Sequence, residues 1–162
     1  MEEELLKVLK GSRIFEGLEE EECRKVLALL EPIKFKSGEI IFEEASPGTE
    51  LYVMPRGRVS VELRLADKSV TERIYQAYDN EVFGEMALID GHRRSARVRA
   101  MEDLEIFKVE REKLLALMEE DYRIGYKIMS NMAKILATRL RDTNLSLRNA
   151  LLQNRYIFDE IQ

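Results

Sequence analysis

The middle of the chain constrains the fold most, because from Ile33 to about Val109 it consists of short segments of alternating polarity separated by turn residues. In the clearest segment, apolar side chains occupy every second position: Val59, Ser60, Val61, Glu62, Leu63, Arg64, Leu65. A period of two residues gives a strand one buried and one solvated face. A polar turn at Ala66-Asp67-Lys68-Ser69 precedes a returning strand with Ile74-Tyr75, and further strands follow around Val98 and over Leu104 to Val109. Many short strands at regular spacing predict an antiparallel sandwich or jelly roll.

Helical patterns flank this strand region on both sides. Residues 1–31 contain two predicted helices, Glu2 to Lys10 and Glu19 to Leu30. The second opens with four glutamates, which suit a helix N-terminus, and Pro32 is expected to stop it. Residues 111–162 are predicted to hold two more helices, the second capped by Asp121. The sequence thus predicts one mainly β domain over residues 1–162, with N-terminal helices, a jelly roll over residues 32–110 and C-terminal helices.

The last predicted helix runs from Tyr122 to about Arg155 and carries a heptad pattern. Most residues at its two seam positions are apolar: Tyr126, Ala133, Leu140, Leu147 and Asn154 at one, and Met129, Leu136, Thr143, Ala150 and Ile157 at the other. A helix of about 34 residues is about 50 Å long, more than a small β-sandwich can cover. The pattern therefore predicts a coiled-coil seam that pairs two copies of the chain as a homodimer.

Composition narrows the functional classes. The chain has 162 residues, 45% of them hydrophobic and 35% charged, which is typical of a globular domain. No apolar run approaches the 18 residues of a membrane span, and the acidic start Met1-Glu2-Glu3-Glu4 is unlike a secretory signal. A single cysteine, Cys23, leaves no disulfide framework, so we expect a cytoplasmic protein. The net charge of −5 argues against nucleic-acid binding.

Residues 83–96, which we call the cassette, are typical of a site for a phosphate ester attached to a sugar. Gly84 allows close approach of backbone to a ligand, and Glu85 to Ile89 can form a helical turn. The free N–H groups of Glu85 and Met86 would then face an anion. Arg94 adds a permanent positive charge whose planar fork matches two phosphate oxygens. Glu85 would repel phosphate, so we expect it to accept a hydrogen bond from a sugar hydroxyl.

The cassette resembles that of the cyclic-nucleotide-binding domains, in which Gly-Glu-x-Ala/Gly-Leu is followed by Arg-Ser/Thr/Ala-Ala. This chain has Gly84-Glu85-Met86-Ala87-Leu88 and then Arg94-Ser95-Ala96. The segments Ser37 to Phe42, Pro47 to Val53 and Arg56 to Val61 resemble the family's early strands. The resemblance covers about residues 14 to 150. It implies a jelly roll that binds a 3′,5′-cyclic nucleotide, with cyclic AMP favoured over cyclic GMP. A binding site of this kind needs no metal or cofactor.

The resemblance also implies individual roles. Arg94 and Ser95 would hold the phosphate with Gly84 and Met86, and Glu85 the ribose 2′-OH. Arg139 on the long helix matches a family position that can orient this glutamate. Taken alone, Arg94 would be an ordinary surface residue, Glu85 a helix cap and Ser95 a solvent-facing serine.

Thr143 and Asn144 are the candidates for recognising the base, because they match the family's polar pair on the dimer helix. Alternatively, Thr143 only sets the register of the coiled coil, as lone polar seam residues do. The resemblance also implies that the long helix transmits ligand binding to a protein partner that these residues do not specify.

Two rival functions remain. A ligand-free assembly module would keep the cassette only as a structural turn. A metal-dependent jelly-roll enzyme would need several histidines, whereas His92 is the only one in the sequence. The family's DNA-binding module needs on the order of 60 residues, and only 19 follow Thr143, so DNA binding by this chain is not expected.

Overall fold

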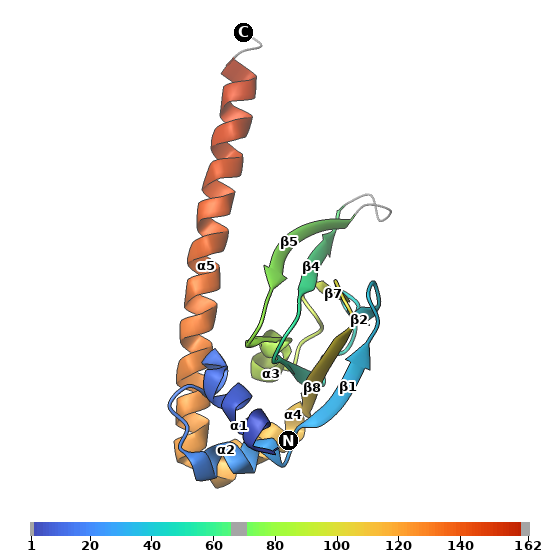
Figure 1. Cartoon of the computed structure of the whole chain (residues 1–162). Helices are drawn as coiled ribbons and strands as arrows, with labels where there is room; N and C mark the ends of the chain where they lie inside the picture. The colour runs from blue at the N-terminus through green and yellow to red at the C-terminus, as the bar shows by residue number, and fades with distance from the viewer. Residues whose placement is uncertain (1, 66–70, 160–162) are drawn as a thin grey trace.

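The computed structural model describes residues 2–65 and 71–159 and confirms the predicted architecture of a β-roll flanked by helices (Figure 1). Within these residues, eight strands form two four-stranded antiparallel sheets, ordered β1-β8-β3-β6 and β2-β7-β4-β5. The strands are β1 Glu31–Phe35, β2 Ile40–Phe42, β3 Glu50–Met54, β4 Val59–Arg64, β5 Thr71–Ala77, β6 Glu81–Phe83, β7 Arg97–Ala100 and β8 Leu104–Glu110. The predicted polar turn at residues 66–69 lies outside the described residues.

In the described part of the chain, six helical segments accompany the sheets: α1 Glu2–Gly11, the 3₁₀ segment η1 Arg13–Phe15, α2 Glu20–Leu27, α3 Glu85–Asp90, α4 Arg111–Glu120 and α5 Tyr122–Asp159. The predicted second helix was too long, because α2 ends at Leu27 and Pro32 lies inside β1 rather than after a helix. β1 is the outer strand of its sheet, and an edge strand tolerates the missing N–H of proline. The predicted boundary between helices and strands therefore moves to Glu31.

Strand β3 divides the hydrophobic core into two clusters. Leu51 and Val53 face the helices, whereas Tyr52 and Met54 face the interior of the roll. This alternation follows from the two-residue period of a strand. The interior cluster includes stacked rings of Phe42, Tyr52 and Phe83, with Tyr52 and Phe83 centroids 5.3 Å apart. The cassette leaves this interior at Phe83 and enters α3.

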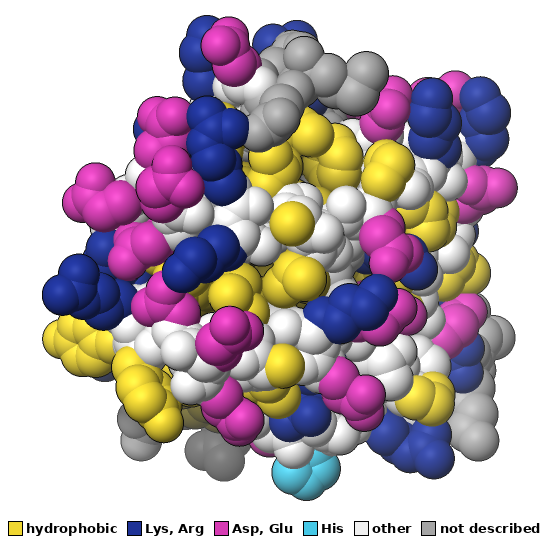
Figure 2. Space-filling model, turned by 90° about the horizontal axis from the view of Figure 1, so that it is seen from below, with side chains coloured by type: hydrophobic (Ala, Val, Ile, Leu, Met, Phe, Trp, Pro, Cys, Tyr) yellow, Lys and Arg dark blue, Asp and Glu magenta, His cyan; other side chains and the backbone are white. Residues whose placement is uncertain are grey.

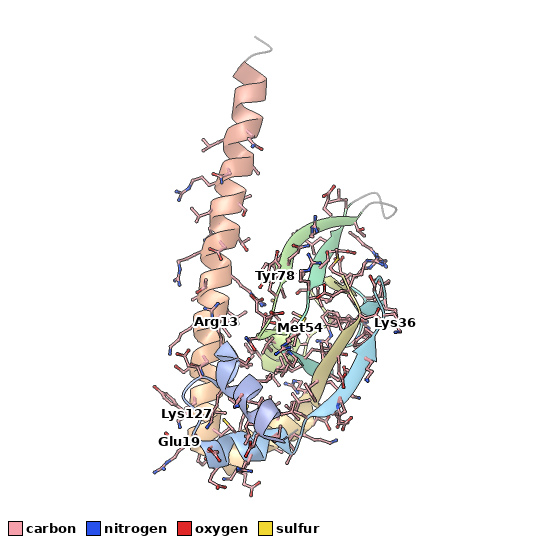
Figure 3. The ribbon with its side chains drawn as sticks, in the orientation of Figure 1. Arg13, Glu19, Lys36, Met54, Tyr78 and Lys127 are labelled. Atoms are coloured by element: carbon pink, nitrogen blue, oxygen red, sulfur yellow. The ribbon has the colours of Figure 1, made fainter. Side chains whose placement is uncertain are left out.

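The first half of α5 is fixed to the N-terminal helices. Ile124, Ile128 and Met132 are fully buried, and the Asn131 side-chain amide donates to the carbonyls of Ile14, at 3.2 Å, and Glu16, at 2.8 Å. Lys127 lies near the start of α2 (Figure 3), where its ammonium donates to a Glu22 carboxylate oxygen at 2.6 Å. As predicted, Asp121 caps α5, its carboxylate accepting from the backbone N–H groups of Arg123 and Ile124.

The second half of α5 extends past the roll (Figure 1), and residues 140–153 are exposed. Several large apolar side chains lie on it uncovered in the single chain, including Leu140, Leu147 and Leu151 at about 60% exposure. The predicted seam residues Asn154 and Ile157 have side chains outside the described part of the structure. This half of the helix therefore contributes little to the core of its own chain.

Charges of both signs cover the surface. The face in Figure 2 shows Lys and Arg side chains interspersed with Asp and Glu around small hydrophobic groups, with no segregated basic area. None of the helices within residues 2–65 and 71–159 combines the length and apolar composition that crossing a bilayer requires.

Candidate functional site

The cassette turns sharply at Gly84, which precedes α3 in a left-handed conformation with φ of 82°. A Cβ at this position would lie 2.5 Å from Nη1 of Arg94 and 3.1 Å from the carbonyl oxygen of Glu50. Only glycine fits both the backbone angle and the space. The turn therefore brings Gly84, at the start of α3, against the Arg94 guanidinium. The predicted approach of this backbone to a ligand stays a prediction.

Arg94 is buried, with 2% of its side chain exposed. Its Nη2 donates to the Glu50 carbonyl at 2.8 Å and lies 3.4 Å from a carboxylate oxygen of Glu50, and its Nη1 donates to the Gly84 carbonyl at 3.3 Å. The guanidinium also stacks 4.1 Å above the Phe42 ring. Burial lowers the pKa of Arg94 from its ordinary value, and among the described atoms its buried Nε has no hydrogen-bond partner. The site thus holds a rigid, incompletely paired cation behind the first turn of α3.

Glu85, the first residue of α3, is 4% exposed and pairs with the Arg139 guanidinium of α5. Arg139 also donates to the Val82 carbonyl at 3.3 Å and lies 5.3 Å from the Tyr75 ring. The expected contact between Arg139 and Glu85 is present, and it joins the cassette to the long helix. The role of this pair in binding the ribose of a ligand stays a prediction.

Tyr75 and Glu81 complete this cluster. The Tyr75 hydroxyl donates to the Glu81 carboxylate, and burial together with this carboxylate raises the pKa of Tyr75 to about 12. A cleft of about 200 Å³ lies between η1, strands β5 and β6, and α5, and it is lined by Arg13, Tyr75, Glu81, Thr138 and Arg139 among others. The cleft is partly enclosed and contains both cationic and anionic groups.

Ser95 and Met86 lie side by side at the outer edge of the cassette. The Ser95 hydroxyl donates to Sδ of Met86 at 3.4 Å, and both side chains are exposed. The first N–H groups of α3, including those of Glu85 and Met86, have no acceptor within the helix itself. The serine hydroxyl therefore lies beside the Met86 side chain, which comes from the first turn of α3.

Thr143 and Asn144 are not brought to the cassette. Both are exposed on the second half of α5, and the Thr143 hydroxyl donates back to the Arg139 carbonyl at 2.8 Å. Thr143 follows Arg139 by one helical turn, so it lies on the same side of α5 as the residue that touches Glu85. Their predicted contact with a base stays a prediction.

The other arginines near Arg94 in the sequence, Arg93, Arg97 and Arg99, have hydrogen-bond partners of their own. Arg97 donates to Glu43 at 2.8 Å and Arg99 to Glu62 at 3.2 Å, while Arg93 donates to the Ala45 carbonyl. These carboxylates come from β4 and from the segment after β2, so their approach could not be read from neighbouring residues. Among the arginines of residues 93–99, Arg94 is therefore the one whose guanidinium packs behind the start of α3.

Sequence reasoning missed several residues that build the site. Glu50 lies 44 positions before its partner Arg94, and Tyr75 lies 64 positions before Arg139, so no local spacing indicates either contact. Phe42 was noted only as part of an early strand. Arg111, which contacts the end of α3, stood out only as the start of a predicted helix.

No group of three or more potential metal ligands occurs within residues 2–65 and 71–159. His92 is exposed, and its Nδ1 lies 3.2 Å from a carboxylate oxygen of Asp90 two residues earlier. Two ligands from neighbouring residues on a loop do not make the three- or four-ligand site that a transition metal needs.

Comparison with known proteins agrees with this geometry. Residues 32–121 match the family model described as the cyclic nucleotide-binding domain. A cyclic AMP receptor protein from Thermus thermophilus is 34% identical over 140 residues, which cover 86% of this chain and 62% of that protein. A regulatory subunit of cAMP-dependent protein kinase from Emericella nidulans is 30% identical over 99 residues, covering 61% of this chain and 23% of that protein.

A solved structure agrees as well. The crystal structure of Thermus thermophilus catabolite activator protein superposes with a TM-score of 0.73 at 32% identity, covering 84% of this chain and 62% of that one. This chain therefore spans less than two thirds of the length of these relatives.

Proposed function

We propose that this chain, which belongs to the cyclic nucleotide-binding domain family, is a non-catalytic sensor that binds a 3′,5′-cyclic nucleotide, with cyclic AMP favoured over cyclic GMP. The observation that carries the proposal is the Arg94 guanidinium, buried behind Gly84 and incompletely paired. A buried cation without full compensation is costly, so an anion at the start of α3 would complete the site.

The phosphate of a cyclic nucleotide is a diester with one negative charge, which one guanidinium can match. We assign it to Arg94, the Ser95 hydroxyl and the N–H groups that follow Gly84. Glu50, 3.4 Å from Nη2, aligns the guanidinium without saturating its donors. Arg94 would thus provide charge and the start of α3 would provide orientation.

We assign Glu85 to the ribose, whose 2′-OH donates a hydrogen bond to its carboxylate. Its carboxylate is nearly buried, and Arg139 supplies the counter-charge that lets it stay ionised beside a phosphate. One carboxylate oxygen can accept from Arg139 while the other accepts from the 2′-OH. The requirement for a free 2′-OH would exclude deoxynucleotides.

The preference for cyclic AMP rests on the relatives whose names mention it and on Thr143 and Asn144 as base contacts. These two residues are exposed one turn beyond Arg139, so their contribution requires α5, from this chain or a second copy, to lie against the bound base. We propose that ligand binding favours this position of α5 and so changes the surface offered to a protein partner.

The exposed apolar residues of α5 favour pairing of two chains through this helix. The same observation supports the second candidate function, a ligand-free assembly module, in which the helix pairs and the cassette is only structural. Leu147→Glu should convert a dimer into a monomer in sedimentation velocity under either function, since it places a charge in the seam. A wild-type protein that sediments as a monomer would contradict the pairing.

Thermal unfolding with and without nucleotide separates the two functions. A ligand selective for the native state stabilises it by about 2.7 kcal/mol at one hundred times Kd, so cyclic AMP should raise Tm. Arg94→Gln should abolish the rise, whereas Arg93→Gln, the exposed neighbour, should keep it. No rise with cyclic AMP or cyclic GMP would favour the assembly module.

A further inference from the structure

The cleft between η1, strands β5 and β6, and α5 is separate from the cassette. None of the residues that line it belongs to residues 83–96, all of which the structure describes. Arg139 is where the two regions meet, because its guanidinium pairs with Glu85 while its side chain lines the cleft. The cleft measures about 200 Å³. Pockets for drug-sized ligands measure about 300–1,000 Å³, so this one suits a smaller molecule.

Two charged side chains of opposite sign line the cleft from different elements. Arg13 comes from η1, which lies beside α5 (Figure 3), and Asp142 comes from α5 itself. Both are exposed, and among the described residues neither has a hydrogen-bond or ion-pair partner. Because they do not pair with each other, guanidinium donors and carboxylate acceptors are both available in one cleft.

The other polar groups of the cleft are already engaged. The Thr138 hydroxyl donates to a carbonyl of its own helix at 3.0 Å, and Arg139 is held by Glu85. The Tyr75 hydroxyl donates to one oxygen of the Glu81 carboxylate, which leaves the second oxygen as an acceptor. The unpaired arginine and the unpaired aspartate are therefore the main charged groups left for a ligand.

Apolar side chains complete the lining. Ile14 is fully buried, Val82 is nearly so, and Ile135 packs against the helical part of the core. A short aliphatic group would lose contact with water on this surface. A ligand matched to the whole lining thus carries a carboxylate, an ammonium and an aliphatic group.

We propose that this cleft binds a small aliphatic α-amino acid. Its carboxylate would accept two hydrogen bonds from the planar fork of Arg13. Its ammonium would donate to Asp142 and to the second oxygen of Glu81, while its side chain packs on Ile14 and Ile135. A ligand with only one of the two charges would cover the cleft and leave Arg13 or Asp142 without a counter-charge.

The test is a chemical-shift titration of the isotope-labelled full chain without nucleotide. L-Leucine at millimolar concentration should shift the amide resonances of η1 and of α5 around Thr138. Isoamylamine lacks the carboxylate of leucine and isocaproate lacks its ammonium, so each should bind at least about tenfold more weakly through the loss of one charge-assisted contact. Glycine, which lacks the aliphatic group, should also bind more weakly than L-leucine.

Variants locate the site. Arg13→Gln and Asp142→Asn should each weaken L-leucine binding by about tenfold or more. Lys7→Gln and Glu112→Gln are the matched controls, because each removes an exposed charge of the same sign from another helix, and both should bind L-leucine as wild type does. Dispersed amide resonances report that each variant is folded, and the comparison of probes on wild type does not depend on any variant.

The absence of shifts at the cleft with millimolar L-leucine would overturn the inference. So would equal binding of L-leucine and isocaproate, or an affinity for L-leucine that neither Arg13→Gln nor Asp142→Asn changes. Because these titrations contain no nucleotide, such a failure leaves the proposed function standing. Failure of wild type to bind cyclic AMP would likewise leave this inference standing.

Discussion

Gly84→Ala tests the packing of the cassette against its arginine. The new Cβ would lie 2.5 Å from Nη1 of Arg94 and 3.1 Å from the Glu50 carbonyl oxygen, so Arg94 must shift. A left-handed angle costs a non-glycine residue about 1–2 kcal/mol. Displacing the charge-assisted bonds of Arg94 costs about 1.5–3 kcal/mol more. The free energy of unfolding should fall by about 2.5–5 kcal/mol, the sum of the two effects.

Gly38→Ala is the matched control. Gly38 has φ of 86°, close to the 82° of Gly84, but a Cβ there meets nothing within 4 Å. Its substitution should cost only the backbone strain, about 1–2 kcal/mol. Both variants are compared by urea unfolding without nucleotide, and then titrated with cyclic AMP.

The difference between the two variants measures the cassette contact. Gly84→Ala should lose at least 1.5 kcal/mol more than Gly38→Ala, a value near the lower limit for a hydrogen bond to a charged group. It should also bind cyclic AMP at least tenfold more weakly, the equivalent of about 1.4 kcal/mol, whereas Gly38→Ala binds normally. Equal losses of stability in the two variants would refute the tight packing of Gly84 on Arg94.

Three further perturbations follow from other contacts. Glu85→Gln and Arg139→Gln, combined in a double-mutant cycle by urea unfolding, should give a coupling of about 1–3 kcal/mol, and additive losses would contradict a working ion pair. Asn131→Ala should lower the free energy of unfolding by about 1–3 kcal/mol, because two backbone carbonyls lose their donor, and an unchanged midpoint would count against this lock. The hydrogen bond from Arg97 lowers the pKa of Glu43 below its ordinary value of 4.5. The ionised Glu43 carboxylate therefore stabilises the folded chain above pH 4.5, and this stabilisation is lost as the pH falls through the folded-state pKa. Wild type should therefore lose more stability than Glu43→Gln between about pH 5 and about pH 3 in pH-dependent unfolding, and parallel curves would be inconsistent with this pair.

Much of the fold could be predicted because local periodicity encodes it. The alternation of apolar and polar residues around Val59 and Val61 predicted strand β4, and the proline-free heptad pattern predicted helix α5. The end of α2 was predicted three residues too late, because Pro32 was expected to stop this helix but lies in the edge strand β1. Which strand lies at the edge of a sheet depends on contacts between distant residues, so the local sequence does not indicate it. Pro32 pairs opposite Phe107, 75 residues away.

The site was predictable where its residues are neighbours in sequence and not where the fold joins distant ones. Gly84, Glu85 and Arg94 lie within eleven positions, and a family resemblance supplied Arg139. Glu50 and Arg111 approach the cassette from β3 and α4, and only tertiary structure reveals them. Neutralisation of Arg97 and Arg99 by Glu43 and Glu62 depends likewise on strand pairing.

Calorimetry with three nucleotides tests the central claim most directly. The account predicts that cyclic AMP binds at one site per chain, that linear 5′-AMP binds much more weakly because its dianionic phosphate does not match a single guanidinium, and that Arg94→Gln abolishes binding. Cyclic GMP should bind more weakly than cyclic AMP. The absence of heat from millimolar cyclic AMP with folded wild-type protein, or equal binding by Arg94→Gln, would contradict it.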